Sequence, residues 1–288
     1  MKLNKKTGIF LILPAFIILI TIFIGPTIYT IVLSFSSYSF TGVEFSGLSN
    51  FSRLFNDPSF WRAFYNTLIF VGVTVPIELF LGFLLALVAN KAMKGRSIIR
   101  VALLIPWALP TALNALAWRW MYNTDYGLFN SILINLNIID TPINWLGEIP
   151  LAMISMMIVA IWKTSSFMAL LILTGLQTIP SELYEAAKID GATNWQALRK
   201  ITIPLVRPSI MVSLLFRTGD AFRSFELPYN LTGGGPVNST ETLSVFAYNN
   251  FFQYLDFSYS STIALIQFLL LLGLAIIYLG TLRWDIYE

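Results

Sequence analysis

Six windows of consecutive, mostly apolar residues dominate this 288-residue chain. The hydrocarbon core of a bilayer is about 30 Å thick, and a helix needs about 20 residues to cross it. The windows lie at 8–33, 64–89, 97–122, 151–177, 204–228 and 258–282. The strands of a membrane β-barrel would be shorter and would alternate in polarity, a pattern that is absent here. We therefore predict an all-α, polytopic membrane protein with six transmembrane helices, kinked at prolines such as Pro76, Pro106 and Pro110.

The composition agrees with this class and limits the chemistry. Hydrophobic residues make up 56% of the chain and charged residues only 11%, against about 25% charged in a soluble domain. The chain has no Cys and no His, which excludes disulfides, thiolate or imidazole metal sites, histidine bases and cysteine nucleophiles. We predict no catalytic residue, no metal and no cofactor in this chain, and we do not expect an enzyme.

The first window could be a secretory signal peptide, because Lys2, Lys5 and Lys6 precede an apolar run. The run continues to Leu33, however, which is longer than the apolar part of a signal peptide, and no convincing cleavage site follows it. We favour a retained first helix. No soluble domain or internal repeat is evident, so we predict a single transmembrane domain over residues 1–288.

Basic residues in the loops predict the orientation in the membrane, because cytoplasmic loops carry an excess of Lys and Arg. The loops of the opposite side hold only Arg53 and Arg62. Twelve basic residues fall on one side: Lys2, Lys5, Lys6, Lys91, Lys94, Arg96, Arg100, Lys188, Arg199, Lys200, Arg207 and Arg283. We predict that both termini are cytoplasmic and that the 180–204 segment lies on the same side.

A polar insert, YEAAKIDGATNWQALRKITIP at 184–204, separates the fourth and fifth windows. Its first helix begins after Pro180 and ends at Gly191, which supplies a left-handed residue at low cost. Thr193 and Gln196 have the spacing of a capping box that starts a second helix. The insert is therefore predicted to be a cytoplasmic helix-turn-helix.

The second helix is expected to run to about Ile201, before Pro204 opens the next span. Apolar residues recur at spacings of three and four along both helices: Leu183, Ala186, Ala187, Trp195, Leu198 and Ile201. Such a stripe needs a partner. It could rest on lipid headgroups or dock to a cytosolic protein, and the small side chains of the two alanines favour docking.

The stretch EAAKIDG, followed after nine residues by ITIP, resembles the cytoplasmic signature of permease subunits in binding-protein-dependent ABC importers. That signature reads Glu-Ala-Ala, three residues, Gly, nine residues, Ile-x-Leu-Pro, and Ile203 stands where it usually has Leu. The matching residues are Glu185, Ala186, Ala187, Gly191, Ile201 and Pro204. LLILTGLQTIPSELYEAA and LTGGGPVNSTETLSV resemble the carbohydrate-uptake branch of the same family.

The resemblance implies that the insert is a coupling element seated on an ATPase subunit, with Glu185 in contact and Gly191 at the turn. It also implies a second permease subunit, two ATP-binding subunits, an extracytoplasmic solute-binding protein and a place in the cell (inner) membrane. The chain has no Gly-Lys dipeptide and hence no Walker loop, so ATP must be bound by a separate subunit. The 231–236 stretch, LTGGGP, is expected to be either a plain glycine turn or an external loop that meets the solute-binding protein.

Several ionisable residues lie well inside the predicted spans, where a lipid-facing position would be costly. They are Glu78, Arg119, Lys163, Arg217, Asp220, Arg223 and Glu226. The last four are spaced by threes with alternating sign, so neighbouring members can pair across one helical turn. They either form a self-paired packing ladder or line a polar path for substrate. The candidates for that path are Arg217, Asp220, Glu226, Asn114 and Lys163.

The resemblance and the nearly balanced charges together predict a permease subunit of an ATP-driven importer for a sugar or oligosaccharide. A polyamine would favour unpaired acids, and a phosphate ester would favour uncompensated basic groups. ABC importers for those solutes remain alternatives. The alternative from another class is a stand-alone, ion-coupled secondary transporter.

Overall fold

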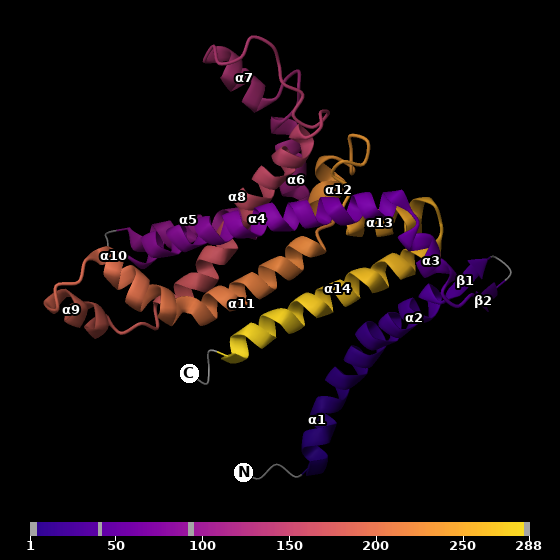
Figure 1. Cartoon of the computed structure of the whole chain (residues 1–288), viewed down its shortest axis with the longest axis horizontal. Coiled ribbons are helices and arrows are strands. Elements are labelled where there is room, and N and C mark those ends of the chain that lie inside the picture. Colours follow the sequence, from indigo (N-terminus) through magenta and orange to yellow (C-terminus); the bar gives the residue numbers. More distant parts are fainter. Residues whose placement is uncertain (1–4, 40–41, 92–94, 285–288) are drawn as a thin grey trace. The chain divides into compact units, whose positions relative to one another are not determined.

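The structure, a computed structural model, describes residues 5–39, 42–91 and 95–284 and is mostly helical (Figure 1). Within these residues, five helices are long and apolar enough to cross a membrane. They span Ile12–Ser34, Pro58–Asn90, Leu151–Leu176, Asn194–Phe222 and Phe257–Gly280. Each overlaps one of the predicted windows, so the prediction of a helical, multi-span protein is confirmed.

The third predicted window is not one helix. Helix α5 (Arg96–Ala108) and helix α6 (Thr111–Met121) are bent by 88° relative to each other. Leu109, between them, is extended (φ −66°, ψ 132°), because the ring of Pro110 disfavours a helical conformation in the residue before it. The predicted 97–122 window is thus broken near its predicted kinks at Pro106 and Pro110, and the described residues hold a sixth crossing only if this bent pair forms one span.

The chain divides into two compact units, and the first comprises residues 1–61 and 246–270. A short antiparallel hairpin in this unit, with Ser36 opposite Phe45 and Ser39 opposite Gly42, departs from the all-α prediction. The elements between its N-terminus and residue 55 are α1 (Lys5–Ile18), η1 (Leu19–Ile24), α2 (Gly25–Ser34), β1 (Ser36–Ser39), β2 (Gly42–Phe45) and α3 (Ser49–Phe55).

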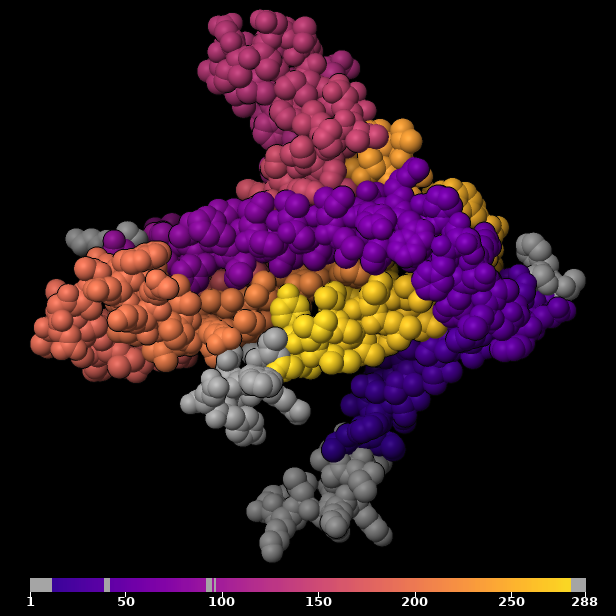
Figure 2. Space-filling model, viewed as in Figure 1, coloured from indigo at the N-terminus to yellow at the C-terminus, as the bar shows by residue number. Residues whose placement is uncertain are grey.

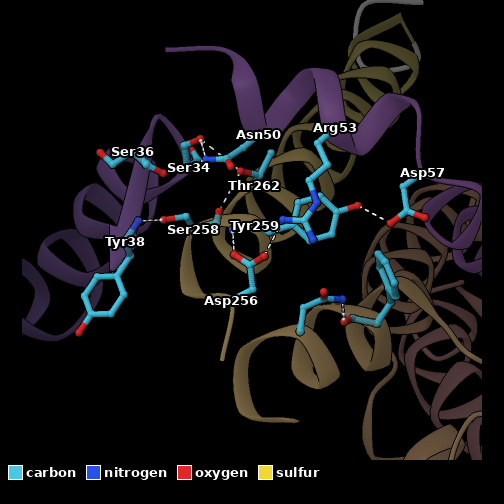
Figure 3. A network of polar contacts seen from close by, with 12 residues as sticks. Ser34, Ser36, Tyr38, Asn50, Arg53, Asp57, Asp256, Ser258, Tyr259 and Thr262 are labelled. Carbon is cyan, nitrogen blue, oxygen red and sulfur yellow. Dashed lines mark hydrogen bonds and ion pairs between the residues drawn. The ribbon is translucent and has the colours of Figure 1, made fainter. Parts of the chain in front are cut away.

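Polar contacts in this unit connect α3 with the first turns of α4 (Pro58–Asn90) and α14 (Phe257–Trp284) (Figure 3). Asp57 accepts a hydrogen bond from the Ser59 amide (2.8 Å), and Asp256 accepts one from the Tyr259 amide (3.1 Å). Arg53 forms an ion pair with Asp256 (2.6 Å) and lies over the ring of Tyr259, whose hydroxyl donates to Asp57 (2.6 Å). Two helix caps are thus linked to each other by one arginine and one tyrosine.

The second unit comprises residues 62–245 and 271–288. Its most buried long helix is α8 (Leu151–Leu176): 61% of its most apolar window is buried, against 28% for Pro58–Asn90 and 28% for Asn194–Phe222. The remaining elements are α7 (Leu128–Asn135), α9 (Ser181–Ile189), α10 (Asn194–Ala197), η2 (Leu198–Thr202), α11 (Ile203–Phe222), α12 (Glu226–Leu231), α13 (Leu243–Tyr248) and η3 (Asn249–Gln253). The last residues of α13 and all of η3 belong to the first unit.

Two glycines let neighbouring helices approach α8 closely. A Cβ atom on Gly82 of α4 would lie 2.6 Å from the Cβ of Met168, and one on Gly175 would lie 2.3 Å from the Oγ of Ser209 on α11. Small residues at such positions are typical of helix packing in membranes, because no hydrophobic force drives helices together in lipid. Helix α8 is therefore held between α4 and α11.

Candidate functional site

The first helix of the predicted coupling element ends as its sequence indicates. The Ala192 amide donates to the Ala187 carbonyl (2.8 Å), and the Gly191 amide donates to the Lys188 carbonyl (3.1 Å). This pair of hydrogen bonds defines a Schellman motif, with Gly191 in the left-handed conformation (φ +78°). The chain reverses here without strain, because glycine has no Cβ atom to oppose a positive φ.

The second helix begins at the predicted capping box but does not end near Ile201. The Thr193 amide donates to the Gln196 side chain (2.7 Å), and the Gln196 amide donates to the Thr193 hydroxyl (3.3 Å). Elements α10, η2 and α11 then continue as one helix, Asn194–Phe222. The π-helical turn η2 lies directly before Pro204, and its wider hydrogen-bond pattern accommodates the missing proline amide without a break. The 180–204 hairpin is thus continuous with a helix that is long and apolar enough to cross a membrane.

One side-chain contact joins the two helices of this hairpin. The hydroxyls of Tyr184 on α9 and Thr202 in η2 lie 2.9 Å apart, and Thr202 is buried. Both residues flank the sharp turn at Gly191. The contact therefore fixes α9 against the helix that enters the membrane region.

Four of the six signature residues are exposed on the hairpin, which lies at the left of Figure 2. Large apolar side chains are exposed beside them, among them Ile189 (86% exposed) and Trp195 (68% exposed). Glu185, Ala186, Gly191 and Pro204 are exposed, whereas Ala187 and Ile201 are partly buried. Exposed apolar surface of this kind is typical of a site that contacts another protein or a membrane.

Inside the long helices, a buried ion pair joins α4 to α11. Arg217 donates from Nε and Nη2 to the two carboxylate oxygens of Glu78, with an Nη2–Oε1 distance of 2.9 Å. The Thr164 hydroxyl on α8 donates to the same carboxylate (2.6 Å). The Glu78 side chain is fully buried and that of Arg217 is 6% exposed. Three helices therefore share one neutralised polar centre.

This arrangement corrects the predicted charge ladder. Arg217 pairs with Glu78 rather than with Asp220, because α4 presents a buried carboxylate to it. Asp220 does pair with Arg223 (2.8 Å), and both side chains are exposed. The helix ends at Phe222, so Glu226 begins a new helix, α12, instead of continuing the predicted row.

The Lys163 amino group serves the end of the broken helix α5. It donates to the carbonyls of Pro106 (3.5 Å), Trp107 (3.0 Å) and Leu109. The Trp107 ring stacks on Phe167, one turn further along α8, with ring centroids 5.5 Å apart. Two side chains one turn apart on α8, Lys163 and Phe167, thus fix the end of α5 to one face of α8.

A cavity of about 560 Å³ opens between these elements. Its wall includes four of the five predicted path residues, Lys163, Arg217, Asp220 and Glu226. Asn114 is buried in α6 and does not line the cavity, and its amide nitrogen finds no hydrogen-bond partner among the described residues. The cavity wall therefore holds two kinds of charged group. Arg217 is buried and paired with Glu78, whereas the carboxylates of Asp220 and Glu226 are exposed.

The lining also contains residues that the sequence analysis did not single out, among them Trp107, Thr164 and Phe225. The two aromatic residues offer flat apolar faces beside the charged groups. An aromatic residue shortly before a proline break could have indicated Trp107, but nothing in the local pattern distinguishes Thr164 from other threonines in spans. No group of three or more Asp or Glu that could hold a metal ion occurs in the ranges described.

The glycine-rich stretch forms a tethered loop instead of a simple turn. Gly233 and Gly234 have positive φ angles, and so do Val237 and Asn238 at the tip. Asn66 of α4 donates to the carbonyls of Asn238 (2.8 Å) and Glu241 (3.0 Å). The loop is therefore held to α4 in one conformation.

The sequence matches a family model described as "Binding-protein-dependent transport system inner membrane component" over residues 45–282. The chain belongs to this family. The match includes the hairpin and the cavity, and it agrees with the resemblance that the signature residues indicate.

Among the relatives, the sulfoquinovosyl glycerol transport system permease protein SmoG of Agrobacterium fabrum is 41% identical over 97% of this chain and 91% of its own length. The trehalose/maltose transport system permease protein MalF of Thermococcus litoralis is also 41% identical, over 98% and 96%. A solved structure of a bacterial ABC transporter for the acidic polysaccharide alginate has a TM-score of 0.84 at 23% identity, covering 95% of this chain and 93% of that one. At this identity the last likeness shows the fold alone.

Proposed function

We propose that this chain is a membrane-spanning permease subunit of an ATP-driven importer that takes up a sugar or oligosaccharide. The observation that carries this proposal is the full-length similarity to two sugar-transport permeases within a family of binding-protein-dependent transport components. A separate ATPase drives alternating access, and the whole of residues 1–288 acts as one permease domain. The same similarity favours the importer over a stand-alone secondary transporter.

The hairpin at 180–204 docks to the ATPase in this proposal. Glu185, Ala186, Ala187 and Gly191 form its contact surface, together with Ile201 and Pro204 at the base. Two features support the assignment: exposed apolar side chains that need a partner, and an unbroken helix from Asn194 to Phe222 that would carry movement from the hairpin to the cavity. The Tyr184–Thr202 contact joins the two helices of the hairpin, which supports a movement of the hairpin as one piece.

The cavity forms this subunit's part of the substrate path. Asp220 and Glu226 are exposed in it and can accept hydrogen bonds from sugar hydroxyls, while Trp107 and Phe225 offer apolar faces for sugar rings. The Arg217 guanidinium gives the N–H groups of Nε and Nη2 to Glu78, and its other N–H donors are left for a substrate hydroxyl. A cavity whose charges are largely paired suits a neutral polyhydroxyl solute better than a polyamine or a phosphate ester.

The importer would contain a second permease subunit, two ATP-binding subunits and an extracytoplasmic solute-binding protein, in the inner membrane. Both termini and the hairpin would be cytoplasmic, and the loop after α12 would face the binding protein. The basic residues of the loops support this orientation. Of the twelve that were counted, Lys2 and Lys94 lie outside the described residues, as do the terminal segments 1–4 and 285–288.

Reconstitution of the complete importer in liposomes tests the proposal. The cognate binding protein, loaded with maltose, trehalose or another member of a sugar panel, should stimulate ATP hydrolysis and ATP-dependent uptake of that sugar. Liposomes with this chain alone should take up none. Uptake by the chain alone, driven by a proton or sodium gradient, would instead establish a secondary transporter.

A further inference from the structure

The break between α5 and α6 leaves backbone carbonyls without their helical partners. In a continuous helix the Pro106 carbonyl would accept from the amide of residue 110, but residue 110 is a proline and has no amide hydrogen. The extended conformation of Leu109 also takes the Trp107 and Leu109 carbonyls out of the regular pattern. In a bilayer such groups must be satisfied by other protein groups or by a water-filled cavity.

Lys163 supplies the missing donor. Its amino group lies within hydrogen-bond distance of the carbonyls of Pro106, Trp107 and Leu109. A lysine side chain has at most three N–H donors, so these three carbonyls can occupy all of them. Although Lys163 lines the cavity, the contacts that it makes are to the backbone at the break.

The same contacts fix the wall of the cavity. Trp107, Leu109, Pro110 and Thr111 all line it, and they are the residues at and around the break. Trp107 is held from two directions, by the Lys163 contact to its carbonyl and by the stacking of its ring on Phe167. The position of the Trp107 ring in the cavity therefore depends on the contacts that hold the break.

We infer that Lys163 is a positioning residue for transport: it replaces the missing amide of Pro110, holds the 88° break and so places Trp107 in the substrate path. The inference rests on the proposed function in taking the cavity as that path. It differs from a direct role of Lys163 in binding substrate, because the residue acts through the α5 backbone. A cation at this place also suits the partial negative charge at the C-terminal end of a helix.

The bend can be measured directly, because the chain contains no cysteine. Spin labels at Ile98→Cys on α5 and Leu116→Cys on α6 occupy exposed positions outside the cavity lining. At 1.5 Å per residue, an unbroken helix would separate these positions by about 27 Å, and a right-angled break would bring them to about 19 Å. Electron–electron double resonance on the full-length chain in lipid nanodiscs distinguishes the two.

Lys163→Met should lengthen and broaden this distance, whereas Lys163→Arg, which keeps several donors, should retain the wild-type distance. Lys91→Met, an exposed lysine just after α4, is the matched control and should leave the distance unchanged. In Pro110→Ala/Lys163→Met the restored amide should recover the yield of folded protein while the distance stays long. A wild-type distance in Lys163→Met, or no recovery of yield in the double variant, would overturn the inference.

A transport measurement separates positioning from simple packing. In the complete importer with maltose as the probe, Lys163→Met should lower the sugar transported per ATP hydrolysed by about tenfold, the scale of one lost charged hydrogen bond, and Lys163→Arg should restore it. A packing role alone would lower uptake and ATP hydrolysis in parallel and leave the ratio unchanged. If the wild-type importer transports no maltose, the choice of sugar fails, but the label distances still decide the role of Lys163.

Discussion

Two of the arginine–carboxylate pairs in the described part of the chain join distant parts of the sequence in opposite surroundings. Arg217–Glu78 connects two long helices of one unit, with side chains 6% and 0% exposed. Arg53–Asp256 connects α3 with the start of α14 in the other unit, with side chains 56% and 31% exposed. The chemistry is the same, but only the second pair can exchange its partner for water.

The acids of the two sites also differ in what else they do. Asp256 caps its own helix, as Asp57 does for α4, so each has a local role that survives the loss of Arg53. The partners of Glu78 are side chains from two other helices, Thr164 and Arg217. The interior contact therefore depends on tertiary packing, whereas the contact at the helix ends depends mainly on local sequence.

The largest effect is expected from Arg217→Met, which leaves the Glu78 carboxylate buried without its cation. Breaking one partner of a buried pair costs about 3–5 kcal/mol. We expect a large loss of monodisperse protein and a much lower melting temperature, measured by size-exclusion chromatography after heating in detergent.

Two variants test whether this loss comes from the stranded charge. Glu78→Leu/Arg217→Met removes both charges and should recover most of the stability, because apolar replacements of a buried pair are often tolerated. Arg223→Met removes an exposed arginine just beyond the same helix and should melt like the wild type. An Arg217→Met protein that also melts like the wild type would remove the contrast between the two ion pairs.

Gly191→Pro tests a helix end that, like the caps at Asp57 and Asp256, is formed by local contacts. It should disturb function far more than stability. Proline cannot adopt the φ of +78° and cannot donate to the Lys188 carbonyl. In the complete importer, we expect loaded binding protein to stimulate ATP hydrolysis no longer, while membrane insertion stays normal. Gly191→Asn, which tolerates the left-handed conformation, should keep most of the stimulation. Wild-type stimulation in Gly191→Pro would contradict the coupling role of the hairpin.

The same division between local and distant contacts explains what the sequence can predict. The Schellman motif at Gly191 and the capping box at Thr193 involve residues within five positions of each other, and both were predicted correctly. The Arg217–Glu78 pair joins residues 139 positions apart. Local spacing favoured Asp220 as the partner of Arg217, because charges three residues apart can always meet on a helix, but packing brought in a carboxylate from α4.

The broken third span was only half predictable for a related reason. Pro106 and Pro110 indicate a kink, but the sequence does not show how far a helix bends once an outside donor can satisfy its carbonyls. That donor, Lys163, comes from α8, more than fifty residues later. A charge inside a predicted span indicated that Lys163 belongs to a functional site, whereas its contacts show that it donates to backbone carbonyls at the α5 break.

Asp220→Asn tests an exposed pair that lies in the cavity. The Asp220–Arg223 pair is a surface pair across one turn, worth no more than about 1 kcal/mol. Assembly of the importer and its melting temperature should therefore change little, whereas uptake should fall because a carboxylate that accepts sugar hydroxyls is lost. Purified complex and initial uptake rates are measured on the same preparations. Equal losses in assembly and uptake would indicate that the pair serves packing.

The smallest effect is expected from Arg53→Met, although this residue makes both a 2.6 Å ion pair and a cation–π contact with Tyr259. Its exposure limits the ion pair to about 0–1 kcal/mol, and the ring contact adds about 0.5–1 kcal/mol. Arg53→Lys keeps the charge but loses the planar group, so it separates the two contributions. The ion-pair share of the loss should shrink as salt is raised from 0.05 to about 1 M, because the Debye length then falls to about 3 Å. A loss of stability as large as that of Arg217→Met, and independent of salt, would show that this cluster depends on its arginine as strongly as the buried one does. Exposure of the side chains would then not determine what an arginine–carboxylate pair contributes to stability.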